Sequence, residues 1–311
     1  MLSRPDVLVL GAGGAPGEAW LIGVLAGIED GAGLDLRGCE YFVGTSAGAI
    51  VAAHLAAGNR PRQPPSVARE RWPGGENPPT PLAAAALAAA ALGAARQTRG
   101  LALAASARLA PLALGLAAPG GALVRAALLR SLPRPVEMLD RLRAEIEATG
   151  ASFDGRLRVV AVQRSSGRRV VFGRPGAPPA SPSQAVEASC TVPWLFAPVV
   201  IDGQEYVDGG VWSPTNLDAA PAGRDTQVLC LNPTANIVGD RTVMPVVRGV
   251  SRSAASIEAL ALRGRGASVQ IVAPDVDSAA AIGASVIDGE PTGRVLESAY
   301  KQGLSLAHAA N

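Results

Sequence analysis

Ser46 is the residue whose surroundings most clearly indicate chemistry. It stands at the centre of GTSAG, from Gly44 to Gly48, after a short apolar run that begins at Tyr41 and before an Ala-rich, helix-forming run. Glycines two before and two after a serine leave room for a sharp strand-to-helix turn, which exposes the hydroxyl at the N-terminus of the helix. The GxSxG spacing therefore predicts a nucleophilic serine.

A serine hydroxyl is a weak nucleophile unless a neighbour accepts its proton, and histidine is the usual partner. The chain has only two histidines. His54 lies about 12 Å from Ser46 along the predicted helix, so we expect it to be a packed or surface residue. His308, near the C-terminus, would complete the chain order of an α/β-hydrolase triad with Ser46 and Asp208, and such a triad is one alternative.

Asp208 is the carboxylate best placed to activate the serine directly. It follows a predicted strand and precedes Gly209 and Gly210. A carboxylate can act as general base when it lies within hydrogen-bond reach of the hydroxyl. An aspartate beside glycines can also be a turn residue that caps backbone N–H groups, which is the structural alternative. Asp202, in an Asp-Gly pair between two short strands, is expected to be such a turn residue.

A glycine loop lies upstream, between an apolar run at 6–10 and a predicted helix from 18 to about 30. Backbone N–H groups in a loop at a helix N-terminus suit an anion. One candidate is the pyrophosphate of a dinucleotide. The spacing of Gly11, Gly13 and Gly17 is GxGxxxG, however, and no acidic residue closes the second strand, as a dinucleotide site would require.

The other candidate anion is transient. When Ser46 attacks an ester carbonyl, an oxyanion forms that backbone N–H groups can stabilise. The N–H groups of Gly13, Gly14 and Ala47 are the expected donors, because the first two lie in the glycine loop and the third follows the serine. We favour this interpretation because it gives both glycine clusters a role in one site.

The motifs lie on alternating strands and helices. Strand, glycine loop, helix, strand, GxSxG turn and helix make a βαβα unit, which is typical of an α/β fold with a largely parallel sheet. Further strands are expected at 157–163, 169–172, 199–201, 205–207, 225–231 and 269–274, and further helices at 135–149, 252–263 and 292–309.

The segment 81–132 is rich in Ala and Leu and carries scattered arginines. Its longest uncharged run is shorter than the ~20 residues that a membrane-spanning helix needs. Buried helices with arginines at their exposed ends, a mobile cap that meets acyl chains or a membrane surface, and a disordered segment are the three interpretations. We assign 81–132 as a helical cap within one catalytic domain, 1–311, with peripheral membrane contact through the cap.

Composition narrows the class of protein. The chain has 311 residues, 48% of them hydrophobic, which is enough for a large core and excludes a disordered protein. The net charge of +2 gives no argument for nucleic acid. Three cysteines without metal-type spacing predict neither disulfides nor a metal site, and no export signal is visible. We therefore expect a cytoplasmic protein without metal or organic cofactor.

Two blocks of the sequence resemble the patatin-like phospholipase family. LGAGGAPGEAWLIGVLAGIEDG with YFVGTSAGAIVAAHLAAG is similar to the family's oxyanion loop, first helix and nucleophile elbow. EASCTVPWLFAPVVIDGQEYVDGGVWSPTNLDAA is similar to its Pro-Phe-Pro segment, hairpin and DGG motif. The resemblance implies a three-layer α/β/α fold in which Ser46 is the nucleophile, Asp208 the base of a Ser–Asp dyad, and Gly13, Gly14 and Ala47 the oxyanion-hole contributors.

Two positions depart from the family pattern. Ala12 replaces a glycine of the loop, and Pro16 stands where a basic residue is usual. The resemblance implies a lipid acyl hydrolase acting on phospholipids or lysophospholipids through an acyl-enzyme. Because Pro16 removes a positive side chain from the loop, an esterase or thioesterase on other acyl substrates is an alternative. A dinucleotide-binding oxidoreductase and a non-catalytic lipid-binding protein are the alternatives from other classes, and the oligomeric state is open.

Overall fold

The computed structural model describes residues 3–67, 121–132, 134–136, 138–236, 244–287 and 292–309. Most of the segment 81–132 lies outside the described residues. The strands are β1 (Val7–Leu10), β2 (Tyr41–Thr45), β3 (Leu157–Gln163), β4 (Arg169–Phe172), β5 (Val199–Ile201), β6 (Gln204–Asp208), β7 (Gln227–Leu231) and β8 (Ser268–Val272). The α-helices are α1 (Gly14–Ala32), α2 (Ala47–Ala56), α6 (Ala122–Ser131), α7 (Asp140–Ala148), α8 (Pro182–Cys190), α9 (Met244–Arg263), α10 (Val276–Ile287) and α11 (Gly293–Ala309).

The strands of the described chain form one mixed sheet in the order β5-β6-β3-β2-β1-β7-β8, and β4 pairs with β3 beside this path. The pairs β3–β2, β2–β1, β1–β7 and β7–β8 are parallel. The pairs β3–β4, β3–β6 and β5–β6 are antiparallel. The prediction of an α/β fold with a mostly parallel sheet is confirmed.

Strand β3 sets the register that matters for the site. Along one edge its first half pairs with β2, where Val160 faces Thr45. Its second half pairs with β6, where the next residue, Ala161, faces Asp208. Strand β4 pairs across both halves and so occupies the other edge. The carboxyl ends of β2 and β6 therefore meet at adjacent residues of β3.

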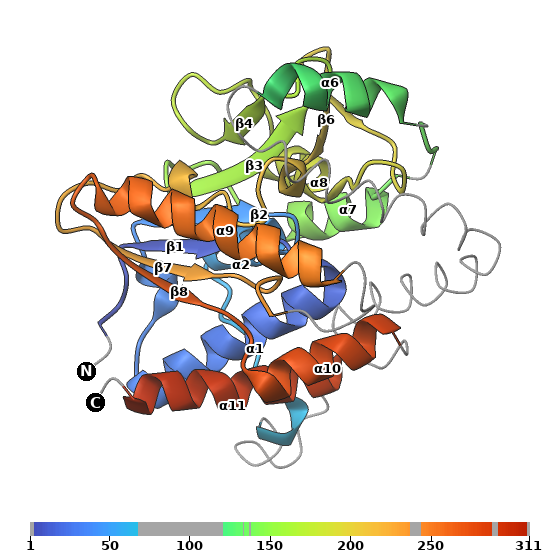
Figure 1. Ribbon diagram of the computed structural model, residues 1–311. Helices are drawn as coiled ribbons and strands as arrows, with labels where there is room; N and C mark the ends of the chain where they lie inside the picture. Colours follow the sequence, from blue (N-terminus) through green and yellow to red (C-terminus); the bar gives the residue numbers. More distant parts are fainter. Residues whose placement is uncertain are drawn as a thin grey trace.

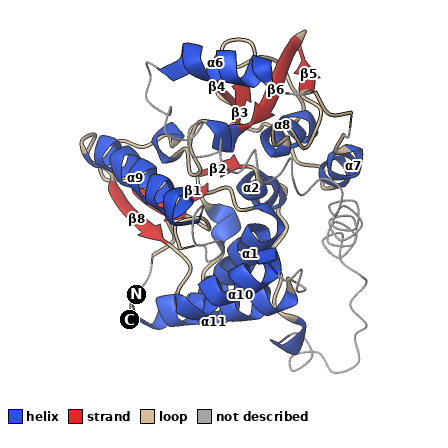
Figure 2. Ribbon diagram, turned by 45° about the vertical axis from the view of Figure 1, so that its right-hand side comes forward, coloured by secondary structure: helices blue, strands red, loops and turns tan. Residues whose placement is uncertain are grey.

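Helices cover both faces of the sheet (Figures 1 and 2). Strand β1 shows why, because all four of its residues are buried. Leu8 and Leu10 belong to a core with residues of α1, α2, α8 and α11, whereas Val7 and Val9 belong to a second core with Ala259 and Leu262 of α9. A strand buried on both faces is typical of a parallel sheet between helical layers, so the three-layer prediction is confirmed.

Glycines allow α1 and α11 to pack closely. A Cβ atom on Gly27 of α1 would lie 2.8 Å from the Leu304 nitrogen, and one on Gly303 of α11 would lie 2.9 Å from the Gly27 Cα. Backbone therefore meets backbone at this crossing. The two helices run side by side under the sheet in both views (Figures 1 and 2).

Some predicted boundaries were wrong. The first helix begins at Gly14, not Glu18, because the glycine loop already turns into helix there. The helix expected from 135 begins at Asp140, and the one expected from 252 begins at Met244. The Asp202-Gly203 turn is confirmed, with both residues at positive φ. No helix of the described residues is both long and apolar enough to cross a membrane.

Candidate active site

Ser46 lies at the turn between β2 and α2, with φ 53° and ψ −122°. A non-glycine residue at positive φ is strained and persists only where its surroundings enforce it. The two motif glycines allow the neighbouring backbone to pack closely around the turn. A Cβ atom on Gly48 would lie inside van der Waals contact with the Leu10 carbonyl group, and one on Gly44 would lie 2.6 Å from the Gly48 oxygen. The elbow predicted from GxSxG is present.

The backbone of the elbow is held by Ser189, near the end of α8. The Ser46 N–H donates to Ser189 Oγ at 2.9 Å, and that hydroxyl donates to the Val160 carbonyl oxygen at 2.6 Å. Ser189 is fully buried. This residue was missed from the sequence, although it lies in the quoted segment EASC, because its role depends on a contact with a distant part of the chain.

Asp208 ends β6 and is buried, with 5% of its surface exposed. Its Oδ1 accepts a hydrogen bond from the Gly210 N–H at 2.7 Å. Gly209 must be glycine for space, since a Cβ there would clash with the Val160 carbonyl oxygen. Ser46 and Asp208, predicted from separate motifs, are therefore brought together where β2 and β6 meet on β3.

Burial raises the pKa of Asp208 from 3.8 to about 6, and the Gly210 N–H and the Ser46 hydroxyl oppose that rise. The Ser46 side chain thus interacts with the carboxylate. Within the described chain no hydrogen bond of standard geometry joins the two, and in enzymes a hydrogen bond between nucleophile and base often tightens only when substrate binds. At pH 7 the Asp208 carboxylate remains mostly ionised.

Asn216 ties the two halves of the site together. Its Nδ2 donates to Thr45 Oγ1 at 3.1 Å, to the Gly209 carbonyl oxygen at 3.2 Å and to the Ser213 carbonyl oxygen at 2.7 Å. The residue is fully buried and has φ 48°. One amide therefore bonds both the strand before Ser46 and the loop after Asp208. Sequence reasoning missed this residue.

Glu258 of α9 holds the loop around Asn216 through hydrogen bonds to the residues on both sides of it. Its Oε2 accepts hydrogen bonds from Thr215 Oγ1 at 2.7 Å and from the Leu217 N–H at 2.8 Å. Burial raises the pKa of Glu258, and these hydrogen bonds oppose the rise. The loop that carries Asn216 is thus anchored to a helix on one face of the sheet.

The glycine loop presents backbone N–H groups at the start of α1. Gly11 donates to the Leu231 carbonyl oxygen and Ala12 to the Pro214 carbonyl oxygen, at 3.0 and 2.8 Å. No hydrogen bond among the described residues uses the N–H of Gly13 or Gly14, nor that of Ala47, the first residue of α2. These three donors begin two helices, where partial positive charge collects.

Space and backbone conformation explain why glycine occupies Gly13 and Gly14. A Cβ atom on Gly13 would lie 2.7 Å from the Gly17 Cα and 2.8 Å from Pro233 Cβ. Gly14 has φ 60°, which glycine adopts without strain. Pro16 lies in the first turn of α1, where a backbone N–H is not needed for the helix. The departure at Pro16 therefore leaves the helix start intact.

Two titratable groups beside the site were not foreseen. Burial, reinforced by the Asp208 carboxylate, raises the pKa of the Cys190 thiol well above its ordinary value, although the Ser46 hydroxyl opposes this. Cys190 is therefore a thiol and not a thiolate at neutral pH. Burial and the Glu145 carboxylate raise the pKa of Glu18 to about 8, so its carboxyl is mainly neutral at pH 7.

The structure does not assemble a histidine triad. His54 Nε2, on α2, lies 3.7 Å from Glu145 Oε1. His308 is exposed in the last turn of α11, the helix that packs along α1. Within the described residues, no hydrogen bond or ion pair joins either histidine to Ser46 or Asp208.

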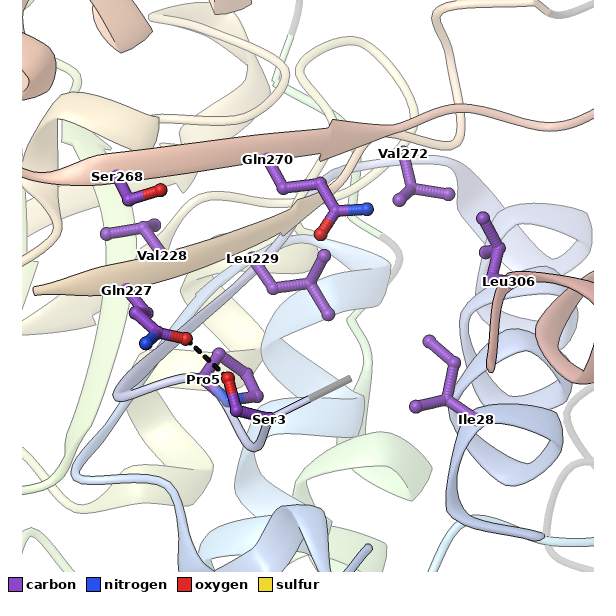
Figure 3. A pocket seen from close by; sticks show the side chains of 10 residues that line it. All are labelled: Ser3, Pro5, Ile28, Gln227, Val228, Leu229, Ser268, Gln270, Val272 and Leu306. Atoms are coloured by element: carbon purple, nitrogen blue, oxygen red, sulfur yellow. Dashed lines mark hydrogen bonds between the residues drawn. The ribbon is translucent and has the colours of Figure 1, made fainter. Parts of the chain in front are cut away.

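A groove elsewhere does not belong to this site. Figure 3 shows it between β7, β8, α1 and α11, with Ser3 Oγ donating to Gln227 Oε1 at 2.7 Å. Its lining includes neither Ser46 nor Asp208. Among the residues that the structure describes, no cluster of three or more His, Cys, Asp or Glu side chains is arranged to hold a metal ion.

Comparisons with known proteins assign the family. The sequence model of patatin-like phospholipases matches residues 8–221, from β1 to the loop after Asp208. Comparison with curated proteins finds no match. Among solved structures, VipD from Legionella pneumophila is similar over 99% of this chain and 67% of its own, with 15% identity and a TM-score of 0.40. Because the family model matches more than half of the chain, this protein belongs to the patatin-like phospholipase family.

Proposed function

We propose that this protein is a serine lipid acyl hydrolase that cleaves fatty-acyl esters, with Ser46 as nucleophile and Asp208 as general base. The observation that carries the proposal is the register on β3, which brings the ends of β2 and β6 to adjacent residues. Unused N–H groups at the starts of α1 and α2 support it further, as does membership of the patatin-like family.

The proposed reaction begins with attack of Ser46 Oγ on the acyl carbonyl carbon, while the Asp208 carboxylate accepts the hydroxyl proton. The carbonyl oxygen becomes an oxyanion that accepts hydrogen bonds from the N–H groups of Gly13, Gly14 and Ala47. As the intermediate collapses, the proton on Asp208 passes to the departing alcohol oxygen. Asp208 then takes a proton from a water molecule, which attacks the acyl-enzyme. As this second intermediate collapses, the proton passes from Asp208 to Ser46 Oγ and the fatty acid leaves.

The surroundings of Asp208 suit a base without a histidine. A pKa of about 6 makes this carboxylate a stronger base than an exposed aspartate, yet leaves it mostly ionised at pH 7. The Gly210 hydrogen bond to Oδ1 helps to orient the carboxylate. Burial and one backbone donor together therefore set both strength and direction.

The substrate class follows from the family rather than from a built headgroup site. We propose phospholipids or lysophospholipids as substrates, and simpler acyl esters or thioesters as the second candidate because Pro16 supplies no positive charge to the loop. Residues 1–311 would act as one catalytic domain. Peripheral contact with a membrane through the segment 81–132 belongs to the same proposal, and 81–120 lies outside the described residues.

A long-chain alkyl fluorophosphonate tests the proposal, because it phosphonylates only an activated serine. We expect the wild-type protein to be labelled on Ser46 and Ser46→Ala to remain unlabelled. Absence of label on the wild type, or equal label on Ser46→Ala, would reject the hydrolase. Titration with NAD(P)H, followed by the fluorescence of the cofactor, then tests the dinucleotide alternative. That alternative is disfavoured because β2 does not end in the acidic residue that a dinucleotide site uses.

A further inference from the structure

Helix α6 carries a buried arginine. Arg125 has no exposed surface, although it lies in a helix whose Leu123 and Val124 are exposed. On the same side of α6, Leu129 packs with Val207 and Val211, which flank the Asp208-Gly209-Gly210 motif. A side chain of α6 therefore shares a hydrophobic cluster with residues on both sides of the proposed base.

The Arg125 guanidinium is held by specific contacts. Its Nη1 donates to the Gly167 carbonyl oxygen, in the turn between β3 and β4, at 2.6 Å. The guanidinium also lies over the ring of Trp212, 4.3 Å from the ring centroid. A planar guanidinium stacks on an aromatic ring and donates in its own plane at the same time, which the ammonium group of lysine cannot do.

Trp212 connects this arginine to the network around the dyad. A second arginine, Arg169, lies 5.2 Å from the Trp212 ring centroid. Arg169 donates to Asp218 at 2.5 and 2.9 Å and to Asn216 Oδ1 at 3.3 Å. Asn216 is the residue that bonds both Thr45 and Gly209. A continuous set of contacts thus runs from α6 to both ends of the dyad.

The loop after Asp208 depends on such contacts, because Gly209 and Gly210 have no side chains to pack. Glycine also has the largest backbone freedom, so this loop is costly to order. Two large side chains follow the glycines directly, Val211 in the cluster with Leu129 and Trp212 at the end of the short helix Gly209–Val211. Side chains on both sides of Gly209 and Gly210 therefore help to hold this loop, and with it the Asp208 carboxylate.

We propose that Arg125 is a positioning residue for Asp208 and acts through Trp212. The packing of α6 on the β3–β4 hairpin would then set the kcat that the dyad reaches. This inference rests on the proposed function. Arg125 does not touch the reacting atoms. Its loss should lower kcat and leave KM nearly unchanged, because the misplaced group is the base and not a substrate contact.

A double-mutant cycle on kcat for a long-chain acyl ester tests this inference. We expect Arg125→Met to lower kcat by about tenfold or more with KM within about twofold. In the Trp212→Leu background, Arg125→Met should lower kcat by less than about twofold, since the connecting ring is already gone. The matched control is Arg130→Met, because Arg130 is exposed on the same helix.

The outcomes separate this inference from the proposed function. Unlabelled wild type in the fluorophosphonate assay rejects the hydrolase itself. Labelled wild type with Arg125→Met equal to Arg130→Met, or with additive effects of Arg125→Met and Trp212→Leu, rejects only the role of Arg125. If Arg125→Met does not fold, as judged by circular dichroism, Arg125→Lys takes its place. It keeps the charge but loses the planar stack, and should show the same fall in kcat and the same non-additivity.

Discussion

Asp208 has a raised pKa and yet remains mostly ionised near pH 7. Burial raises its pKa to about 6 and so makes it a stronger base. The Gly210 N–H and the Ser46 hydroxyl keep it ionised enough to act near pH 7. The proposed mechanism therefore predicts that esterase activity rises with pH through the pKa of Asp208, because only the ionised carboxylate can accept the serine proton.

Replacing Asp208 by Asn should stabilise the protein above pH 6. The folded-state pKa of about 6 exceeds the ordinary 3.8, so burial penalises the charged form, and protonation removes the penalty as the pH falls from 6 toward 3.8. Raising the pKa of this carboxyl from 3.8 to about 6 corresponds to ~3 kcal/mol. Urea unfolding should give Asp208→Asn a free energy of unfolding larger by up to that amount at pH 8, converging with wild type near pH 4. A difference that does not change with pH would contradict this prediction.

Ser189 should contribute to both stability and turnover, because its hydroxyl bonds two buried backbone groups. Ser189→Ala leaves the Ser46 N–H and the Val160 carbonyl oxygen without their partner, and each buried unpaired group costs about 1–3 kcal/mol. We expect a lower Tm and a lower kcat, because the strained elbow loses its tether. The control is Ser305→Ala, an exposed serine of α11. Equal Tm and kcat in the two variants would show that the tether is unimportant.

At the scale of elements, the elbow requires close approach of α2 to β1. Gly48→Ala would drive a methyl group into the Leu10 carbonyl, whereas Gly249→Ala, also within a helix, meets nothing within 4 Å. We expect Gly48→Ala to lose several kcal/mol of stability, as overpacked sites do, and Gly249→Ala to gain up to about 1 kcal/mol from helix propensity. Thermal unfolding compares them, and similar Tm values would contradict the role of Gly48.

The sequence predicted the elements whose signals are local. Ser46 with its two glycines, Asp208 with its two, and the strand-helix alternation were all recognisable from short spacings. Ser189, Asn216 and Glu258 were not, because each acts through a hydrogen bond to a residue far along the chain. The start of α1 at Gly14 was also missed, since glycine and proline normally indicate a loop and here form the first helical turn.

At the scale of the molecule, the candidate site forms because β2 and β6 both pair with β3. The first half of β3 belongs to the parallel part of the sheet and its second half to the antiparallel part. Neither half alone would bring together Ser46 and Asp208, the proposed nucleophile and base.

The contact between α1 and α11 around Gly27 should affect global stability without changing the proposed chemistry, because Gly27 lies far along α1 from Gly13 and Gly14. Gly27→Ala would place a methyl group against the backbone of α11, and Gly293→Ala, at the start of α11, meets nothing within 4 Å. We expect the first to lower Tm by several degrees and the second to leave it nearly unchanged. At temperatures where both remain folded, both should keep normal kcat. A selective loss of kcat in Gly27→Ala would show that this layer is coupled to the dyad.

The most direct test of the account is the turnover of a long-chain acyl ester by Asp208→Asn, His54→Ala and His308→Ala. A Ser–Asp dyad predicts that Asp208→Asn lowers kcat by about 10²–10⁴-fold, the usual contribution of a general base, while both histidine variants stay within about twofold of wild type. An inactive His308→Ala together with near-normal Asp208→Asn would contradict the dyad.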